Sequence, residues 1–129
     1  MFENKNQRDA DFYEQCKQII LNDMGYTTLK QAINQAITMS AKSYYITDGR
    51  ISRIIHSKSV PLSKVKRLLF YHLKRLYIEY NKIENGITVS EVSRIISSSQ
   101  CAPRYYITQA SAKRIYYNEL KRRKLRLLR

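Results

Sequence analysis

The sequence of 129 residues contains no tryptophan, only 3 glycines, 2 prolines and 2 cysteines, and 10 acidic residues against 24 basic ones. With so few helix breakers and much leucine, isoleucine, lysine and glutamine, the chain is predicted to be helical. The two cysteines, Cys16 and Cys101, exclude a disulfide framework, and with His56 and His72 they do not match the ligand spacing of a zinc site. We expect both to be buried free thiols in a reducing compartment.

Long hydrophobic runs are absent as well. No run approaches the 18 residues of a membrane span, and the first 15 residues are polar and acidic, unlike a secretory signal. A chain of this length folds by default as one compact domain, here residues 1–129. We therefore expect a soluble intracellular protein without membrane contact.

Caps and hydrophobic periodicity predict an all-α domain without a substantial sheet. The expected helices cover residues 9–24, 28–39, 48–57, 63–83, 88–98 and 109–129, and residues 44–47 and 105–108 are expected to be extended. Asp9, Thr28, Ser63 and Thr88 are the predicted caps. In the first two helices the expected core faces are Phe12, Cys16, Ile19 and Ile20, and Leu29, Ala32, Ile33, Ala36 and Ile37.

Two stretches of the chain are alike. Residues 41–47, Ala-Lys-Ser-Tyr-Tyr-Ile-Thr, match residues 102–108, Ala-Pro-Arg-Tyr-Tyr-Ile-Thr, at five of seven positions with a shift of 61. The match extends to Thr28 and Thr88 before these segments, at a shift of 60 with a one-residue insertion between the blocks, and to Arg53 and Arg114 after them at a shift of 61. We infer a duplicated helix-connector-helix unit, with copies at about 28–58 and 88–120 joined by a long spacer helix, and a basic tail at 121–129.

The pattern Thr-Leu-x-x-Ala-Ile-x-x-Ala-Ile followed by Ala-x-x-Tyr-Tyr-Ile-Thr, at residues 28–47, resembles small basic uncharacterised proteins of gut Bacteroidetes and their crAss-like phages. The second segment, residues 102–108, matches better because it has the Pro-Arg that the first replaces with Lys-Ser. The resemblance implies a phage or mobile-element origin, hence the host cytoplasm or the virion as location. It implies no activity and no catalytic residue.

A helix, a connector and a second helix also form the helix-turn-helix of DNA-binding proteins, although this connector of about seven residues is longer than the standard turn. The second helices would offer Arg50, Ser52, Arg53, His56 and Lys58 in the first copy, and Gln109, Ser111, Lys113, Arg114 and Asn118 in the second. Arg, Gln and Asn side chains read guanine and adenine edges.

The tyrosine pairs at 44–45 and 105–106 are expected to place one ring in the core and the other outward, since side chains alternate along extended chain. The outward ring could stack on a sugar or an unpaired base, with Arg104 on the phosphate. Inward packing with a satisfied hydroxyl is the expected role of the other ring.

The spacer helix and the tail carry the densest basic faces. Core positions of the spacer are Val65, Leu69, Leu73, Leu76 and Tyr80, with His72 packed at their border, and the opposite ridge holds Lys64, Arg67, Tyr71, Lys74, Arg75 and Lys82. That ridge spans roughly 27 Å, close to one turn of duplex DNA. The tail, with six cations in residues 121–129, is expected to grip phosphates, while its leucines dock on the core or a second subunit. A solvated basic face is the alternative interpretation of both.

The charge excess is regional. Residues 1–48 hold 5 basic and 6 acidic side chains, whereas residues 49–129 hold 19 basic and 4 acidic ones. A field of this size favours a polyanionic partner, and nucleic acids are the common intracellular polyanions. The predicted nucleic-acid-binding residues are Arg50, Arg53, Lys58, Lys64, Arg67, Lys74, Arg75, Lys82, Arg104, Lys113, Arg114, Lys121, Arg122, Arg123, Lys124 and Arg126.

The sequence offers little for catalysis. The basic region has no pair of carboxylates in a short motif, and the chain has no glycine-rich phosphate loop and no G-x-S-x-G elbow. We therefore predict a non-enzymatic DNA-binding protein that needs no cofactor or metal. A structural or packaged virion protein, with its basic surface on the genome or on an acidic partner, is the alternative, and RNA as ligand and a homo-oligomeric state stay open.

Overall fold

Six helices make up the structure, a computed structural model that describes residues 2–24 and 26–127, with side chains from Lys5 onward. They are α1 (Phe2–Asn22), α2 (Leu29–Thr38), α3 (Asp48–His56), α4 (Lys64–Ile83), α5 (Val89–Ser97) and α6 (Gln109–Leu127). No strand occurs in this part of the chain, where a single isolated bridge joins Ala41 and Ala102. The predicted all-α fold is confirmed.

Threonine hydroxyls cap four of these helices at their first turns. Thr28 Oγ1 accepts a hydrogen bond from the backbone N–H of Gln31 at 3.2 Å, and the Gln31 side chain accepts one from the Thr28 N–H at 3.0 Å, which completes a capping box. Thr47, Thr88 and Thr108 cap α3, α5 and α6 with their side chains, Thr108 by accepting a hydrogen bond from the Ser111 N–H at 3.1 Å. The predicted caps Thr28 and Thr88 are confirmed, whereas Ser63 precedes α4 without a capping bond from its side chain.

The predicted cap at Asp9 is wrong. The first helix begins at Phe2, and Asp9 lies inside it, only 9% exposed, where it accepts hydrogen bonds from the Arg8 guanidinium at 2.9 and 3.1 Å. No glycine or proline stands between residues 2 and 9 to begin the helix later. A hydrogen bond of 2.9 Å from Gln7 to Asp11, one turn apart, supports the helix across this point.

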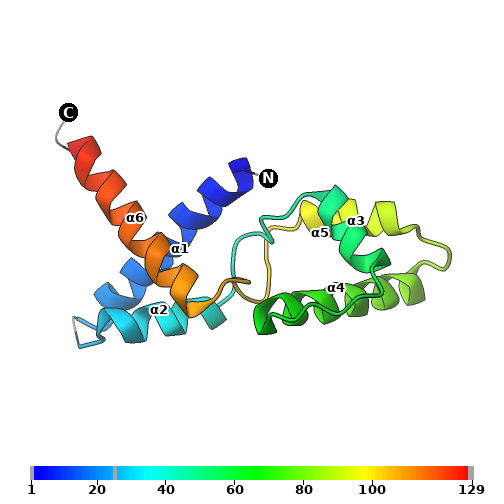
Figure 1. The fold of residues 1–129 in the computed structure, drawn as a ribbon, viewed down its shortest axis with the longest axis horizontal. Coiled ribbons are helices and arrows are strands. Elements are labelled where there is room, and N and C mark those ends of the chain that lie inside the picture. The colour runs from blue at the N-terminus through cyan, green and yellow to red at the C-terminus, as the bar shows by residue number, and fades with distance from the viewer. Residues whose placement is uncertain (1, 25, 128–129) are drawn as a thin grey trace.

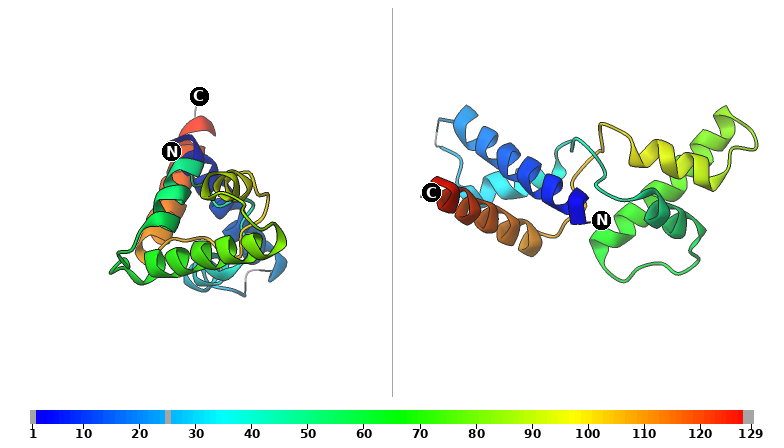
Figure 2. Two further views of the ribbon diagram at one scale, coloured as in Figure 1. Left: turned by 90° about the vertical axis from the view of Figure 1, so that its right-hand side faces the viewer. Right: turned by 90° about the horizontal axis from the view of Figure 1, so that it is seen from above.

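The helices form two groups of three. Helices α1, α2 and α6 pack together, and so do α3, α4 and α5. Figures 1 and 2 show the two groups on opposite sides of the segments that join α2 to α3 and α5 to α6. The predicted core faces are largely confirmed, with Phe12, Cys16 and Leu73 fully buried, and Phe70 is a further buried residue that the sequence analysis did not assign. The first group therefore joins helices from both ends of the chain, whereas the second consists of three consecutive helices.

The two joining segments, residues 39–47 and 98–108, meet between the groups. Ala41 and Ala102 exchange backbone hydrogen bonds of 2.9 and 2.8 Å, and the Tyr105 N–H donates to the Ile37 carbonyl at 3.1 Å. Each segment carries the next helix away from the preceding one, so that, over the described residues, α2 does not contact α3 and α5 does not contact α6. The helix-turn-helix-like arrangement predicted for each copy is therefore not formed.

Candidate nucleic-acid interface

The tyrosine pairs lie where the two joining segments, which we call the connectors, meet at the Ala41–Ala102 bridge; we call this place the connector crossing. Tyr44 and Tyr105 are buried, at 9% and 3% exposure, and Tyr45 and Tyr106 are half-buried. The rings stack across the crossing, Tyr44 on Tyr106 with centroids 6.4 Å apart and Tyr45 on Tyr105 at 6.0 Å. The expected burial of one ring in each pair is confirmed, and the second ring of each pair is covered on one side by a ring of the other pair.

Two hydroxyl contacts tie the connectors to the long helices. Tyr45 Oη donates to Asp11 Oδ2 on α1 at 2.6 Å, and Tyr44 Oη lies 2.7 Å from His72 Nε2 on α4. Burial raises the pKa of Tyr44 to about 12, and burial together with the bonded Asp11 carboxylate raises that of Tyr45. Burial, then the positive charge of Arg75, lowers the pKa of His72. The predicted packing of His72 at the border of the core is confirmed.

A basic pocket of about 410 Å³ lies beside this crossing. Its cationic lining comes from α1, α3, α4, α6 and the second connector, and consists of Lys5, Arg8, Arg50, Lys66, Arg104 and Arg114. Hydroxyls of Ser43, Ser63, Thr108 and Ser111 line it as well, and none of the described lining residues is acidic. Of these side chains, Arg8 forms an ion pair with Asp9 at 2.9 Å. The pocket therefore gathers positive charge from segments far apart in the chain.

A second pocket of about 420 Å³ adjoins the first, because Arg50 and Lys66 line both. Arg53 adds a third cation there, and Ile54, Pro61, Leu69 and Phe70 supply apolar walls. No acidic residue of the described chain lines this pocket either. Together the two pockets form one basic surface along the connector crossing and the facing sides of α3 and α4.

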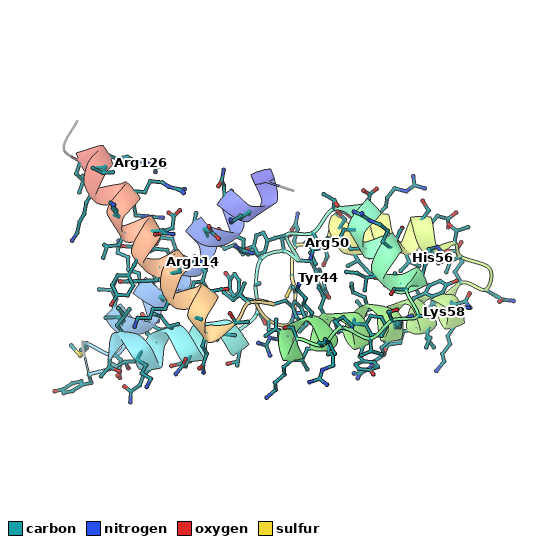
Figure 3. The ribbon with its side chains drawn as sticks, in the orientation of Figure 1. Tyr44, Arg50, His56, Lys58, Arg114 and Arg126 are labelled. Atoms are coloured by element: carbon teal, nitrogen blue, oxygen red, sulfur yellow. The ribbon has the colours of Figure 1, made fainter. Side chains whose placement is uncertain are left out.

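The predicted binding residues divide into those at the crossing and those far from it. Arg50, Arg53, Arg104 and Arg114 line the two pockets, and the Arg104 guanidinium also lies over the Tyr106 ring at 5.8 Å. Figure 3 places Lys58 beyond the outer end of α3 and Arg126 at the outer end of α6. The other predicted cations that are exposed away from these pockets are Lys64, Arg67, Arg75 and Lys82 on α4, and Lys113, Lys121 and Lys124 on α6.

Lys74 does not belong to the exposed ridge of α4. Its ammonium donates to the Ile55 carbonyl near the end of α3 at 3.0 Å and lies over the Phe70 ring, 4.7 Å from the centroid. A cation at this position satisfies a carbonyl of the last helical turn, which has no partner within its own helix. Lys74 therefore links α3 and α4, and the phosphate contact predicted for it stays a prediction.

Two arginines of the tail are also engaged within the protein. Glu119, 3% exposed, lies 2.8 Å from Arg122 and 3.7 Å from Arg123, and Arg123 also reaches Glu14 on α1 at 2.6 Å. The Arg123 guanidinium stacks 4.3 Å from the Tyr13 ring. Arg123 therefore joins α6 to α1 while Arg122 pairs within α6, and the phosphate contacts predicted for both stay a prediction.

Leu125 and Leu127 of the tail do not dock on the core, and docking on a second subunit, the other placement expected for them, stays a prediction. Leu125 and Leu127 are 53% and 86% exposed, because α6 projects past the end of its contact with α1. The predicted tail extends to residues 128–129, which lie outside the described part of the chain.

Three pocket residues, Lys5, Arg8 and Lys66, were missed by the sequence analysis. Lys5 and Lys66 stand 61 positions apart, the same shift as the two Tyr-Tyr-Ile-Thr segments. Because the caps Thr28 and Thr88 stand 60 positions apart, an alignment extended toward the N-terminus pairs the two lysines only with a one-residue gap before these caps. Their meeting in one pocket depends on how the long helices pack.

Among the described residues no group of three His, Cys, Asp or Glu side chains is placed to hold a metal ion, and no helix is long and apolar enough to cross a membrane. Cys16 is buried, but Cys101 is exposed, so the expectation that both thiols are buried is wrong for Cys101. It lies just before Ala102 in the connector, outside the helices.

Comparisons with models of protein families, with curated proteins and with solved structures found no match for this chain.

Proposed function

We propose that this protein is a non-enzymatic DNA-binding protein that holds the phosphate backbone of a duplex, of the phage or mobile-element origin that the sequence resemblance implies. The observation that carries the proposal is the pocket at the connector crossing, with six cationic side chains and no acidic one among its described lining residues. The ligand of such a pocket must therefore carry negative charge.

The electrostatic argument follows from Coulomb repulsion. Like charges gathered in one pocket repel, and a chain of net charge +14 has few acids with which to offset them. Two unit charges 4 Å apart interact with about 4 kcal/mol at an effective dielectric constant near 20, so a polyanion that neutralises several of these cations at once binds favourably. Phosphodiester chains supply such charge at regular spacing and release counterions on binding.

A duplex suits the arrangement because the cations extend beyond the pockets. Lys64, Arg67, Arg75 and Lys82 are exposed along α4, whose ridge of roughly 27 Å is comparable to one turn of DNA. The proposal assigns these residues to phosphate contacts, which hold the duplex without reading its sequence. Since the helices beside each connector do not pack as a helix-turn-helix, base readout by that arrangement is not part of it.

The test is a salt titration of binding to duplex DNA, single-stranded DNA and RNA. Six phosphate contacts give a slope of log affinity against log salt of about −5 for the duplex, at about 0.9 for each contact. A slope shallower than about −2, or no binding at low salt, contradicts the proposal. Tighter binding to RNA than to duplex DNA would identify RNA as the ligand instead. Arg104→Gln should weaken binding several-fold on every duplex, whereas Lys30→Gln, at an exposed position of α2 outside both pockets, should leave it unchanged.

A further inference from the structure

One lysine and one arginine of each pocket correspond to each other in sequence. Lys5 and Lys66 stand 61 positions apart, and so do Arg53 and Arg114. Lys5 and Arg114 line the first pocket, while Lys66 and Arg53 line the second. The same pair of positions thus recurs, one lysine from a long helix and one arginine from the helix that follows Tyr-Tyr-Ile-Thr.

The helix packing shows the same correspondence. Helix α1 ends at Asn22 and α4 at Ile83, again 61 positions apart. The group of α1, α2 and α6 then corresponds to the group of α4, α5 and α3, with the third helix of each half of the chain packed on the first two helices of the other half. Under this exchange Ala41 and Ala102 pair with each other.

The tyrosine stacks obey the exchange too. Tyr44 on Tyr106 in one stack corresponds to Tyr105 on Tyr45 in the other, with interplanar angles of 11° and 12°. Since backbone pairing, ring stacking and helix packing all repeat, the two Lys-Arg pairs occupy equivalent positions in the fold. Each pair is built by the first helix of one half and the last helix of the other.

We propose that these pairs are two equivalent subsites, each holding one phosphodiester group of the DNA backbone between a lysine and an arginine. The inference rests on the proposed function, which it makes specific. An arginine fork and a lysine ammonium are the side chains that bind phosphate oxygens, by paired hydrogen bonds and by charge respectively. The four side chains are all exposed, and Lys66 and Arg50 line both pockets, so one run of backbone passes from one subsite to the other.

The two subsites differ in what surrounds the pair. Arg8 lines the first pocket at the position that corresponds to Leu69 in the second. The first subsite therefore offers additional positive charge, and the second is bounded by apolar side chains. Both retain the shared Lys-Arg pair, which is the part assigned to the phosphate.

The experiment counts phosphate contacts with double variants of the full chain. Lys5→Gln with Arg114→Gln, and Arg53→Gln with Lys66→Gln, should each reduce the steepness of the salt slope for duplex DNA by about 0.9, since each removes one phosphate contact. All four substitutions together should reduce it by about 1.8. The matched control removes the same charge at exposed positions outside both pockets, Lys17→Gln with Lys30→Gln, and should leave the slope unchanged.

Four results overturn the subsites while the protein still binds DNA with a steep slope. These are a change with one pair and none with the other, no change with either pair, a change with the control as large as with the pairs, and a loss of about 3.6 in the quadruple variant, which means four separate contacts. Absence of DNA binding by the unaltered protein removes the proposed function itself. Because all four side chains are exposed, circular dichroism of each variant should show unchanged helix content, and a variant that loses helix would overturn their assignment as surface ligands.

Discussion

Removal of one hydroxyl, by Tyr45→Phe, tests whether the connector is held to α1 as the structure shows. Tyr45 has a φ of 58°, a left-handed conformation that is unusual for a residue with a side chain. Its hydroxyl donates to Asp11 Oδ2 at 2.6 Å, and its ring stacks on Tyr105. A hydrogen bond to a charged group contributes about 1.5–3 kcal/mol, and the half-buried position of both partners favours the lower end.

We therefore expect Tyr45→Phe to lower the free energy of unfolding by about 1.5 kcal/mol. For a chain of 129 residues, with an unfolding entropy of about 2.1 cal/mol/K per residue, this corresponds to a fall of about 5 °C in the melting temperature. The assay is thermal and urea unfolding followed by circular dichroism. Phenylalanine keeps the ring and its stacking, so the difference measures the hydroxyl.

The matched control is Tyr106→Phe at the corresponding position of the other half. The residue that corresponds to Asp11 there is His72, whose Nε2 is bonded to Tyr44, so the loss of the Tyr106 hydroxyl should cost less than about 0.5 kcal/mol. A double-mutant cycle of Tyr45→Phe with Asp11→Asn should show a coupling of about 1 kcal/mol. Equal effects of the two tyrosine substitutions, or no coupling, would refute the reasoning.

Three further predictions follow from the structure. The pKa of His72 is lowered in the folded protein, so just below pH 6.5, the ordinary pKa of histidine, the unfolded chain binds more protons than the folded one. Melting experiments should therefore show the free energy of unfolding falling as the pH drops through 6.5, and falling less in His72→Gln. At pH 8 iodoacetamide should label Cys101, which is exposed, and spare Cys16, whose pKa burial raises to about 12, leaving roughly one thiolate in ten thousand; equal labelling by mass spectrometry would contradict this. Lys74→Gln should lower the free energy of unfolding by about 1 kcal/mol with no change in the salt slope of DNA binding, whereas Arg67→Gln should change the slope and not the stability; the reverse pattern would restore Lys74 to the binding surface.

Most helix boundaries could be predicted because they depend on neighbouring residues. Thr28 and Thr88 bond to backbone N–H groups three residues ahead, and apolar side chains three or four residues apart mark the buried faces. The start of α1 could not be found in this way, since Asp9 has the residue type of a cap. Its burial and its pairing with Arg8 appear only when the helix is packed.

The candidate site could be predicted only in part. Arg50, Arg53, Arg104 and Arg114 were found from their positions around Tyr-Tyr-Ile-Thr, and all four line the pockets. A basic residue on a helix looks the same in sequence whether it faces water or a buried partner. Glu119, which lines neither pocket, is buried and forms ion pairs with two arginines of the tail. Its burial is set by the packing of α6 on α1.

The sequence by itself determined the six helices, the positive charge and the recurrence of the connector, because capping, periodicity and composition act within a few residues. Only the tertiary structure decided which helices pack together, since that depends on where each connector leads. Ala41 and Ala102 pair their backbones where the connectors cross. Each connector thus leads away from the helix before it, so α3 and α6 pack on helices of the opposite half of the chain. That exchange places the lysines of α1 and α4 beside the arginines of α6 and α3, and it creates the basic pockets.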